Sequence, residues 1–379
     1  MIRPWQQRDG YDSSSGQAWV PNLAYAPFRL LAIVNRMDLC APRVANTLRD
    51  VQNVWRLRGR EADFLKLLGQ ASGGSSFSSI SSYGTFSNNF ADSSSAGEGR
   101  LVFGAIDSEG KPLSGDWTVI FEYRLPIAGT QTVNQWARQW HKIGKLDISS
   151  PEFAVRLEEL TRSFTHRDNP ARCSAQLAQL RSSEAAFGPD REFRQFNGQL
   201  APDLLALTPA QPFAASHSPE QRSLLTFLHE QDALIRMGVH QLPRTLTDDR
   251  QPRPLLAGSA FIPASQPDFH WDRGPLVSRD ARRIFSLSTC NGCHAGETGC
   301  RDGLHIHSRL EGSPARLSDF LRLDGKPHRL NDPDVRGSKI EYQEIRDRAA
   351  IFAALLQPKD RAMIEGLRPI LRERLERTH

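Results

Sequence analysis

The sequence contains no apolar segment long enough to cross a membrane. A membrane helix needs about 20 consecutive apolar residues. The best apolar run, Leu30 to Val34, is far shorter and follows Arg29, so we expect no transmembrane segment. The opening stretch, MIRPWQQRDGYDSSSG, also lacks the apolar core and the small-residue cleavage site of a signal peptide.

Several common functional motifs are missing as well. The sequence has no G-x-S-x-G, H-E-x-x-H, glycine-rich phosphate loop or EF-hand. The net charge of +5 comes mainly from arginines that are scattered along the chain, so we predict no nucleic-acid partner. The hydrophobic fraction of 39% and the charged fraction of 24% are ordinary for a folded protein.

The cysteines are few but concentrated. Three of the five lie between Ser278 and His307, and Cys290-Asn291-Gly292-Cys293-His294 forms a C-x-x-C-H motif. This pattern is typical of covalent attachment of a c-type haem. Two cysteines at this spacing can reach the two vinyl groups of a porphyrin, and the next histidine can bind the iron. The motif therefore predicts a haem held by Cys290, Cys293 and His294.

On this motif and the helix expected before it, the chain resembles the c-type cytochromes. The resemblance implies one haem c, thioether bonds to Cys290 and Cys293, and iron bound by His294. It also implies electron transfer with a redox partner protein, so a carrier is favoured over a catalyst. A haem oxidoreductase whose distal side is open is the enzymatic alternative.

A second resemblance concerns location. The segment APFRLLAIVNRMDL together with CNGCHAGET is similar to uncharacterised exported bacterial proteins. A periplasmic or extracellular protein is expected if haem is attached, and a cytoplasmic one otherwise.

The sixth haem ligand is not the usual methionine. Met363 is the only methionine after the motif, and it lies in an expected helix. His305 is the preferred ligand, and His307 and His328 are alternatives. Ligation by two histidines would lower the reduction potential relative to histidine and methionine.

The same residues allow a structural zinc site in a non-enzymatic binding protein. Cys290, Cys293, Cys300 and either His305 or His307 would supply four tetrahedral ligands. Disulfide-bonded or unligated cysteines are a third interpretation. A thiol-disulfide oxidoreductase is least favoured, because such enzymes place C-x-x-C at a helix N-terminus and this motif is expected to end a helix.

Glu297, soon after the motif, is most simply a solvated loop residue; the alternative is a carboxylate that accepts a hydrogen bond from a ligand histidine or acts in proton transfer.

The hydrophobic pattern predicts an α+β fold. A small antiparallel sheet with several helices should precede a mostly α, cytochrome c-like C-terminal domain. Expected strands cover 28–34, 101–106 and 117–123, and expected helices cover 45–68, 133–143, 151–164 and 218–237. Asn169-Pro170 should open a further helix that carries Leu177 and Leu180.

The expected domain organisation has three parts. Residues 1–240 form an α+β domain of unknown role with a serine-rich loop at 72–95. Residues 241–277 are a proline-rich linker or strap. Residues 278–379 form the helical haem-binding domain, which begins with a helix capped by Ser278 and closes with helices over 341–356 and 358–376.

Overall fold

A computed structural model describes Ser14 and residues 26–37, 95–126, 133–165, 177–185, 190–197, 218–237, 242–243, 245–247, 251–256, 259–263, 265–324 and 326–356. The helices expected over 45–68 and 358–376 lie outside these residues. So does the serine-rich loop, except for Ser95.

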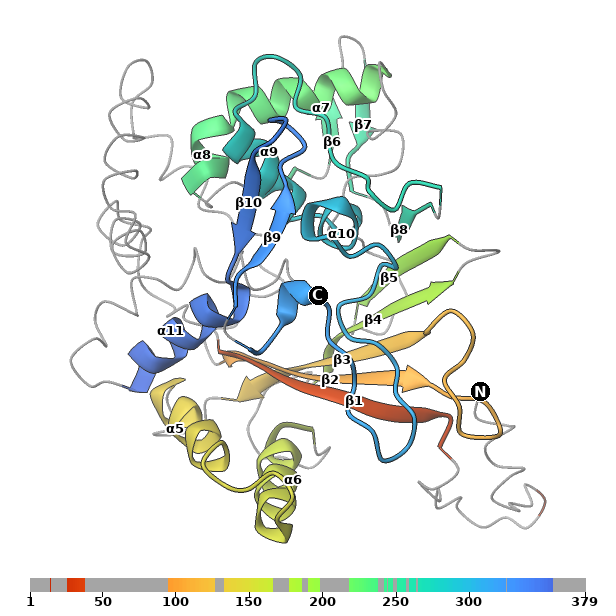
Figure 1. Cartoon of the computed structure of the whole chain (residues 1–379), viewed down its shortest axis with the longest axis vertical. Helices are drawn as coiled ribbons and strands as arrows, with labels where there is room; N and C mark the ends of the chain where they lie inside the picture. The colour runs from red at the N-terminus through yellow and green to blue at the C-terminus, as the bar shows by residue number, and fades with distance from the viewer. Residues whose placement is uncertain are drawn as a thin grey trace.

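An antiparallel sheet of six strands lies at the centre of the described part (Figure 1), in the order β1-β2-β3-β4-β5-β8. Its strands are β1 (Phe28–Met37), β2 (Ser95–Ala105), β3 (Thr118–Pro126), β4 (Leu177–Ala185), β5 (Arg191–Asn197) and β8 (Ser259–Ile262). Two separate hairpins pair β6 (Thr245–Thr247) with β7 (Pro252–Pro254), and β9 (His328–Asn331) with β10 (Lys339–Tyr342). The three strands expected from the apolar runs are confirmed as β1, β2 and β3.

Strand register gives the sheet one face that mixes apolar and polar side chains. One row of paired residues crosses the sheet from β2 to β5 and contains Val102, Ile120, Arg181 and Gln195. Residues that face each other in neighbouring strands point to the same side of a sheet. Thr118, Ser183 and Phe193 form the next row on this side, because side chains alternate with a period of two.

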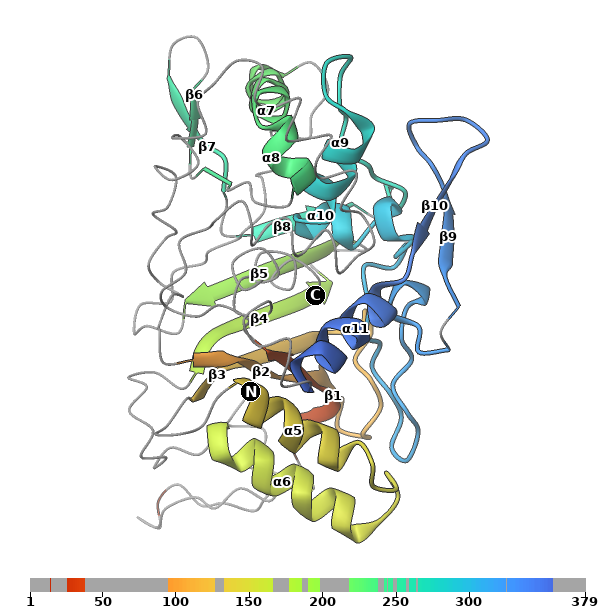
Figure 2. The ribbon, with the colours of Figure 1, turned by 90° about the vertical axis from the view of Figure 1, so that its left-hand side faces the viewer.

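Helices lie at both ends of the row of strands, as Figures 1 and 2 show from two directions. They are α5 (Val133–Ile143), α6 (Pro151–Thr165), α7 (Pro219–Glu230), α8 (Asp232–Met237), α9 (Arg279–Ser286), α10 (Cys290–Cys293) and α11 (Glu344–Leu356). Helices α5 and α6 lie near β1 to β3, and the α7 to α10 group lies beyond β5 and β8. The predictions for α5, α6 and the Ser218-capped helix are confirmed, although the last is divided into α7 and α8.

Among the described residues, two clusters of buried apolar side chains join the elements around the motif. The larger joins α7 and α8 to α9 through residues such as Leu228, Ile235 and Phe285. The smaller packs Ala295, just after the motif, against Phe193, Ala260 and Ile262 of the sheet. Removing this apolar surface from water stabilises the contact of motif and sheet by about 25 cal/mol per Å² buried.

The expectation of a mostly helical, cytochrome c-like C-terminal domain is wrong. In the described part after Ser278, only α11 exceeds eight residues among the helices, and the rest is turns, extended loops and the β9–β10 hairpin. The segment that starts at Glu341 also begins as strand β10, and helix α11 starts at Glu344. The described chain is a mixed structure built on the six-stranded sheet.

The predicted helix through Leu177 and Leu180 is also wrong. This stretch is strand β4, inserted between β3 and β5. Its apolar residues have a helix-like spacing, but pairing with both neighbouring strands outweighs that local preference.

The helices of the described residues are all too short or too polar to cross a bilayer. The expectation of no transmembrane segment is confirmed to that extent.

Candidate metal centre

The C-x-x-C-H motif starts a short helical turn instead of ending a helix. Helix α9 begins where the Ser278 hydroxyl accepts a hydrogen bond from the Ala281 backbone N–H (3.2 Å), as the sequence predicted. The helix ends at Ser286. After a sharp turn, the Thr289 hydroxyl caps α10 by accepting the Gly292 N–H (3.1 Å).

Two close contacts fix the shape of this turn. The Thr289 hydroxyl donates to the Ser286 carbonyl (2.8 Å) and accepts the indole N–H of Trp271 (2.9 Å). Gly292 lies so close to Ser286 that a Cβ there would collide with the Ser286 carbonyl. The motif therefore needs glycine at this position for steric reasons.

His294 is buried and held on both sides. Its Nδ1 lies 2.9 Å from the Gly303 carbonyl oxygen. Because a carbonyl can only accept, Nδ1 carries the proton and Nε2 carries the lone pair in the neutral ring. The ring lies between Phe193 of β5 and His305, with centroid distances of 4.5 Å to each.

His294, Cys300 and His305 form a buried cluster of donor atoms. One ligand atom from each of the three side chains lies within 4.8 Å of the others. The His305 Nδ1 hydrogen bonds to the Ser318 hydroxyl (2.8 Å), which orients Nε2 toward the cluster. Atoms bound at 2.0–2.3 Å to one tetrahedral ion lie roughly 3.3–3.8 Å apart, so small side-chain adjustments would suffice to hold an ion.

Cys293 lies beside this cluster. It is fully buried, and its Sγ is 3.5 Å from His305 Nε2. Among the described residues, the group of three whose ligand atoms are all close together does not include Cys293. None of Cys290, Cys293 and Cys300 forms a disulfide.

The other sequence candidates lie elsewhere. Cys290 is partly buried and lines a neighbouring cavity. The His307 ring accepts a hydrogen bond from Arg316 (3.0 Å) and lies near Asp116 and Asp302. His328 contacts the Thr298 carbonyl through Nε2 (2.9 Å). The zinc alternative named Cys290 and Cys293 as ligands and left His294 idle, whereas the observed cluster contains His294.

Arg191 of β5 fastens the loop that positions His294. Its guanidinium donates to the Asp302 carbonyl (2.9 Å), the Gly115 carbonyl (2.7 Å) and the Ser183 hydroxyl (3.2 Å). Gly303, whose carbonyl binds His294, has a φ of +74° and lies directly against the Arg191 side chain. Glycine is suited to both requirements, since it tolerates positive φ and leaves room for the arginine.

Buried ion pairs fasten the other side of the motif. Glu297, in the 3-10 turn Gly296–Thr298, binds Arg282 of α9 and accepts a hydrogen bond from the Tyr342 hydroxyl (3.0 Å). Arg282 also pairs with Asp334 (2.8 Å). The Glu297 and Arg282 side chains are 0% and 1% exposed, so the expectation of a solvated Glu297 is wrong.

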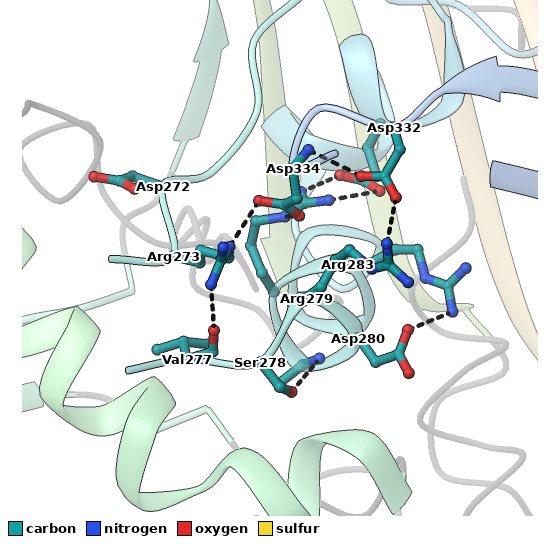
Figure 3. Close-up of polar contacts among 12 residues, drawn as sticks. Asp272, Arg273, Val277, Ser278, Arg279, Asp280, Arg283, Asp332 and Asp334 are labelled. Atoms are coloured by element: carbon teal, nitrogen blue, oxygen red, sulfur yellow. Dashed lines mark hydrogen bonds and ion pairs between the residues drawn. The ribbon is translucent and has the colours of Figure 1, made fainter. Parts of the chain in front are cut away.

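Figure 3 shows the outer part of this network. Arg273 faces Asp334 (3.0 Å) and also donates to the Val277 carbonyl (3.1 Å). A second ion pair joins Arg279 to Asp332 (3.2 Å). The Arg279 pair connects α9 to the turn that joins β9 and β10, and the Arg273 pair connects the segment before α9 to the same turn.

Burial shapes the protonation of the site. It holds the pKa of His294 well below its usual range, and the neighbouring His305 lowers it further. Burial also raises the pKa of Cys290 to about 11. The pKa of Cys300 is raised by burial and by Asp302. The His294 imidazole and the Cys300 thiol are therefore held in their neutral forms. Because the motif starts a helical turn, its position no longer argues against a thiol-disulfide oxidoreductase, but the raised pKa of Cys290 disfavours a reactive thiolate.

A small cavity of about 50 Å³ lies between the motif and the sheet. Its floor is the mixed face described above, and its roof contains Cys290, His294, Leu304, His305 and Ile306. His294 and His305 therefore face it directly.

The fit of a haem to this arrangement is limited by His305. Two histidines on opposite faces of a haem have ring centres roughly 6 Å apart, given metal–nitrogen bonds of about 2 Å. The His294 and His305 rings are 4.5 Å apart, which is closer than two axial ligands of one haem would lie.

The supporting residues Arg191, Arg282 and Asp334 carried no recognisable pattern in the sequence. They reach the site from β5, α9 and the β9–β10 turn, and only the folded chain brings them together.

Comparison of the chain with models of protein families, with curated proteins and with solved structures gives no match, so the site itself is the basis for inferring function.

Proposed function

We propose that the protein binds one transition-metal ion, most simply zinc, through His294, Cys300 and His305. The observation that carries this proposal is the mutual approach of the three ligand atoms to within 4.8 Å in a buried site. Two imidazoles and one thiolate form a donor set that suits zinc.

The hydrogen bonds around the proposed ligands favour a preorganised metal site. The Gly303 carbonyl orients His294 and the Ser318 hydroxyl orients His305. Metal-binding histidines usually have such a partner on the other ring nitrogen, because it fixes the tautomer and the ring orientation. Arg191 in turn fastens the segment that carries Gly303.

Elemental analysis of the full-length protein purified with zinc present tests the proposal. We expect about one zinc per chain, and a strong loss of zinc in each of His294→Ala, Cys300→Ser and His305→Ala. His307→Ala is the matched control, because this buried histidine lies on the same loop but outside the cluster. Absence of zinc, or equal loss in His305→Ala and His307→Ala, would contradict the proposal.

A second candidate is the haem c electron carrier that the C-x-x-C-H motif predicts. The observation in its favour is that Cys290 and His294 line the same cavity, whose walls are mostly apolar. It requires His305 to lie farther from His294 than the observed 4.5 Å. Expression with export and a haem-attachment system, followed by haem staining after denaturing electrophoresis, distinguishes the two candidates. Covalent haem would replace the zinc proposal with this one.

A further inference from the structure

The cavity beside the metal cluster gives the proposed site one accessible side. Two of the three proposed ligands, His294 and His305, are among the residues that line it, whereas Cys300 is not. An ion held by the three side chains would therefore have Cys300 on the protein side. The two imidazoles would lie at the boundary with the cavity.

The number of protein ligands points in the same direction. Structural zinc sites usually have four protein ligands, whereas catalytic sites have three and leave the fourth position to water or substrate. The cluster contains three residues. Among the described residues, Cys293 is the side chain that could supply a fourth protein ligand, because its Sγ lies 3.5 Å from His305 Nε2.

The size of the cavity limits what can enter. A water molecule needs roughly 10–15 Å³ of such space, and the cavity offers about 50 Å³. Most of the wall surface is apolar and comes from Val102, Ile120, Phe193, Leu304 and Ile306. Polar groups on the floor come from Arg181 and Gln195. These dimensions suit a compact donor of a few atoms.

We infer that the metal ion carries an exchangeable fourth ligand, and that the cavity admits a small electron-pair donor to it. Water or hydroxide occupies this position at rest, and a compact anion competes with it. This inference rests on the proposed metal site and goes beyond it. A metal ion with an exchangeable ligand can bind a small molecule, whereas a purely structural ion cannot.

Cobalt-substituted full-length protein provides the test, with azide as the probe. Cobalt(II) reports its coordination through visible absorption bands. We expect azide to shift these bands in a saturable way. Ile120→Phe, which fills the cavity from β3, should weaken the azide response at least tenfold and leave the azide-independent spectrum unchanged. Ile148→Phe is the control, because Ile148 is 78% exposed and is not among the residues that line the cavity.

The outcomes separate the two proposals. Failure to retain cobalt overturns the metal site and this inference together. Retained cobalt with a spectrum that ignores azide overturns the inference alone. In that case a spectral change in Cys293→Ser would identify Cys293 as the fourth ligand of a closed site. If Ile120→Phe disturbs the azide-independent spectrum, Val102→Phe fills the same cavity from β2. An undiminished azide response in a cavity-filled variant with an intact spectrum would exclude the cavity as the route.

Discussion

Glu297 is the residue whose charge most directly ties the motif to the rest of the fold. Its carboxylate is fully buried against Arg282 and the Tyr342 hydroxyl. We expect Glu297→Gln to lower the free energy of unfolding by about 3–5 kcal/mol, because it leaves the buried Arg282 with an incomplete set of partners. Urea unfolding followed by circular dichroism measures this loss.

Asp280→Asn provides the comparison for that measurement. Asp280 pairs with Arg283 at the surface of α9, the helix that also carries Arg282. The Asp280 side chain is 45% exposed. Removing such a pair should cost about 1 kcal/mol or less. Equal losses in the two variants would contradict the structural role of Glu297.

Tyr342 should make stability depend on pH in alkaline solution. Burial and the Glu297 carboxylate hold the pKa of Tyr342 well above its ordinary value. An unfolded tyrosine loses its proton near pH 10, so above that pH the unfolded state is favoured and stability falls; below it, this group has no effect. Ultraviolet titration of tyrosinate should show a late-ionising tyrosine that disappears in Tyr342→Phe, while the signal of Tyr123, whose pKa burial also raises, remains. An unchanged titration curve would count against the prediction.

The sequence led to His294 and preferred His305 over His307 as the second histidine ligand, but it gave no physical reason for that preference. The two differ only by one intervening residue, and the choice depends on partners from other segments. Ser318 orients His305, whereas Arg316, Asp116 and Asp302 surround His307. Spacing along the chain carries no information about such contacts.

Strand β5 contributes to the candidate site through Arg191, which fastens the segment that carries Gly303. Arg191→Lys keeps the charge but cannot reproduce the several directed hydrogen bonds of a guanidinium. We expect the zinc affinity of the variant to fall about 10- to 100-fold, as is usual when a group that orients the metal ligands is lost. Competition with a chromophoric chelator measures this affinity.

Arg156→Lys is the matched control for Arg191→Lys. Arg156 lies on α6 and pairs only at the surface with Glu159, where its side chain is 57% exposed. Its zinc affinity should equal that of the unaltered protein. A similar loss in both variants would show that Arg191 has no special role at the site.

The elements differ in how far the sequence determined them. Strands β1 to β3 were predictable because their apolar runs are interrupted by clear turn residues such as Gly110 and Pro112. Strand β4 was not, because LAQLRSSEA has no apolar alternation and becomes a strand only between two partners. The motif was misplaced for a similar reason: the Thr289 hydroxyl, held by Trp271, starts a new helical turn there.

Metal binding and folding of the protein should be linked. The segment after the motif packs on β5 and β8 through Ala295, so the site and the sheet should unfold together. A ligand at 100 times its dissociation constant adds about 2.7 kcal/mol of stability. We therefore expect the unfolding midpoint to rise with zinc and to fall with a chelator in a single transition, and this dependence should disappear in His305→Ala. Two transitions, of which one ignores zinc, would contradict this linkage.

The ends of the sheet have a consequence for solubility. Exposed edge strands can pair with other chains and start aggregation. Here β8 has four residues and is followed by Pro263, which cannot donate a backbone hydrogen bond. At the opposite edge, the Arg309 side chain binds the Leu30 carbonyl of β1 (3.1 Å), and the Arg29 side chain binds the Arg309 carbonyl (2.9 Å). The loop after His307, which carries Arg309, thus covers part of β1, and a chain in which this loop is displaced would expose an edge strand that can self-associate.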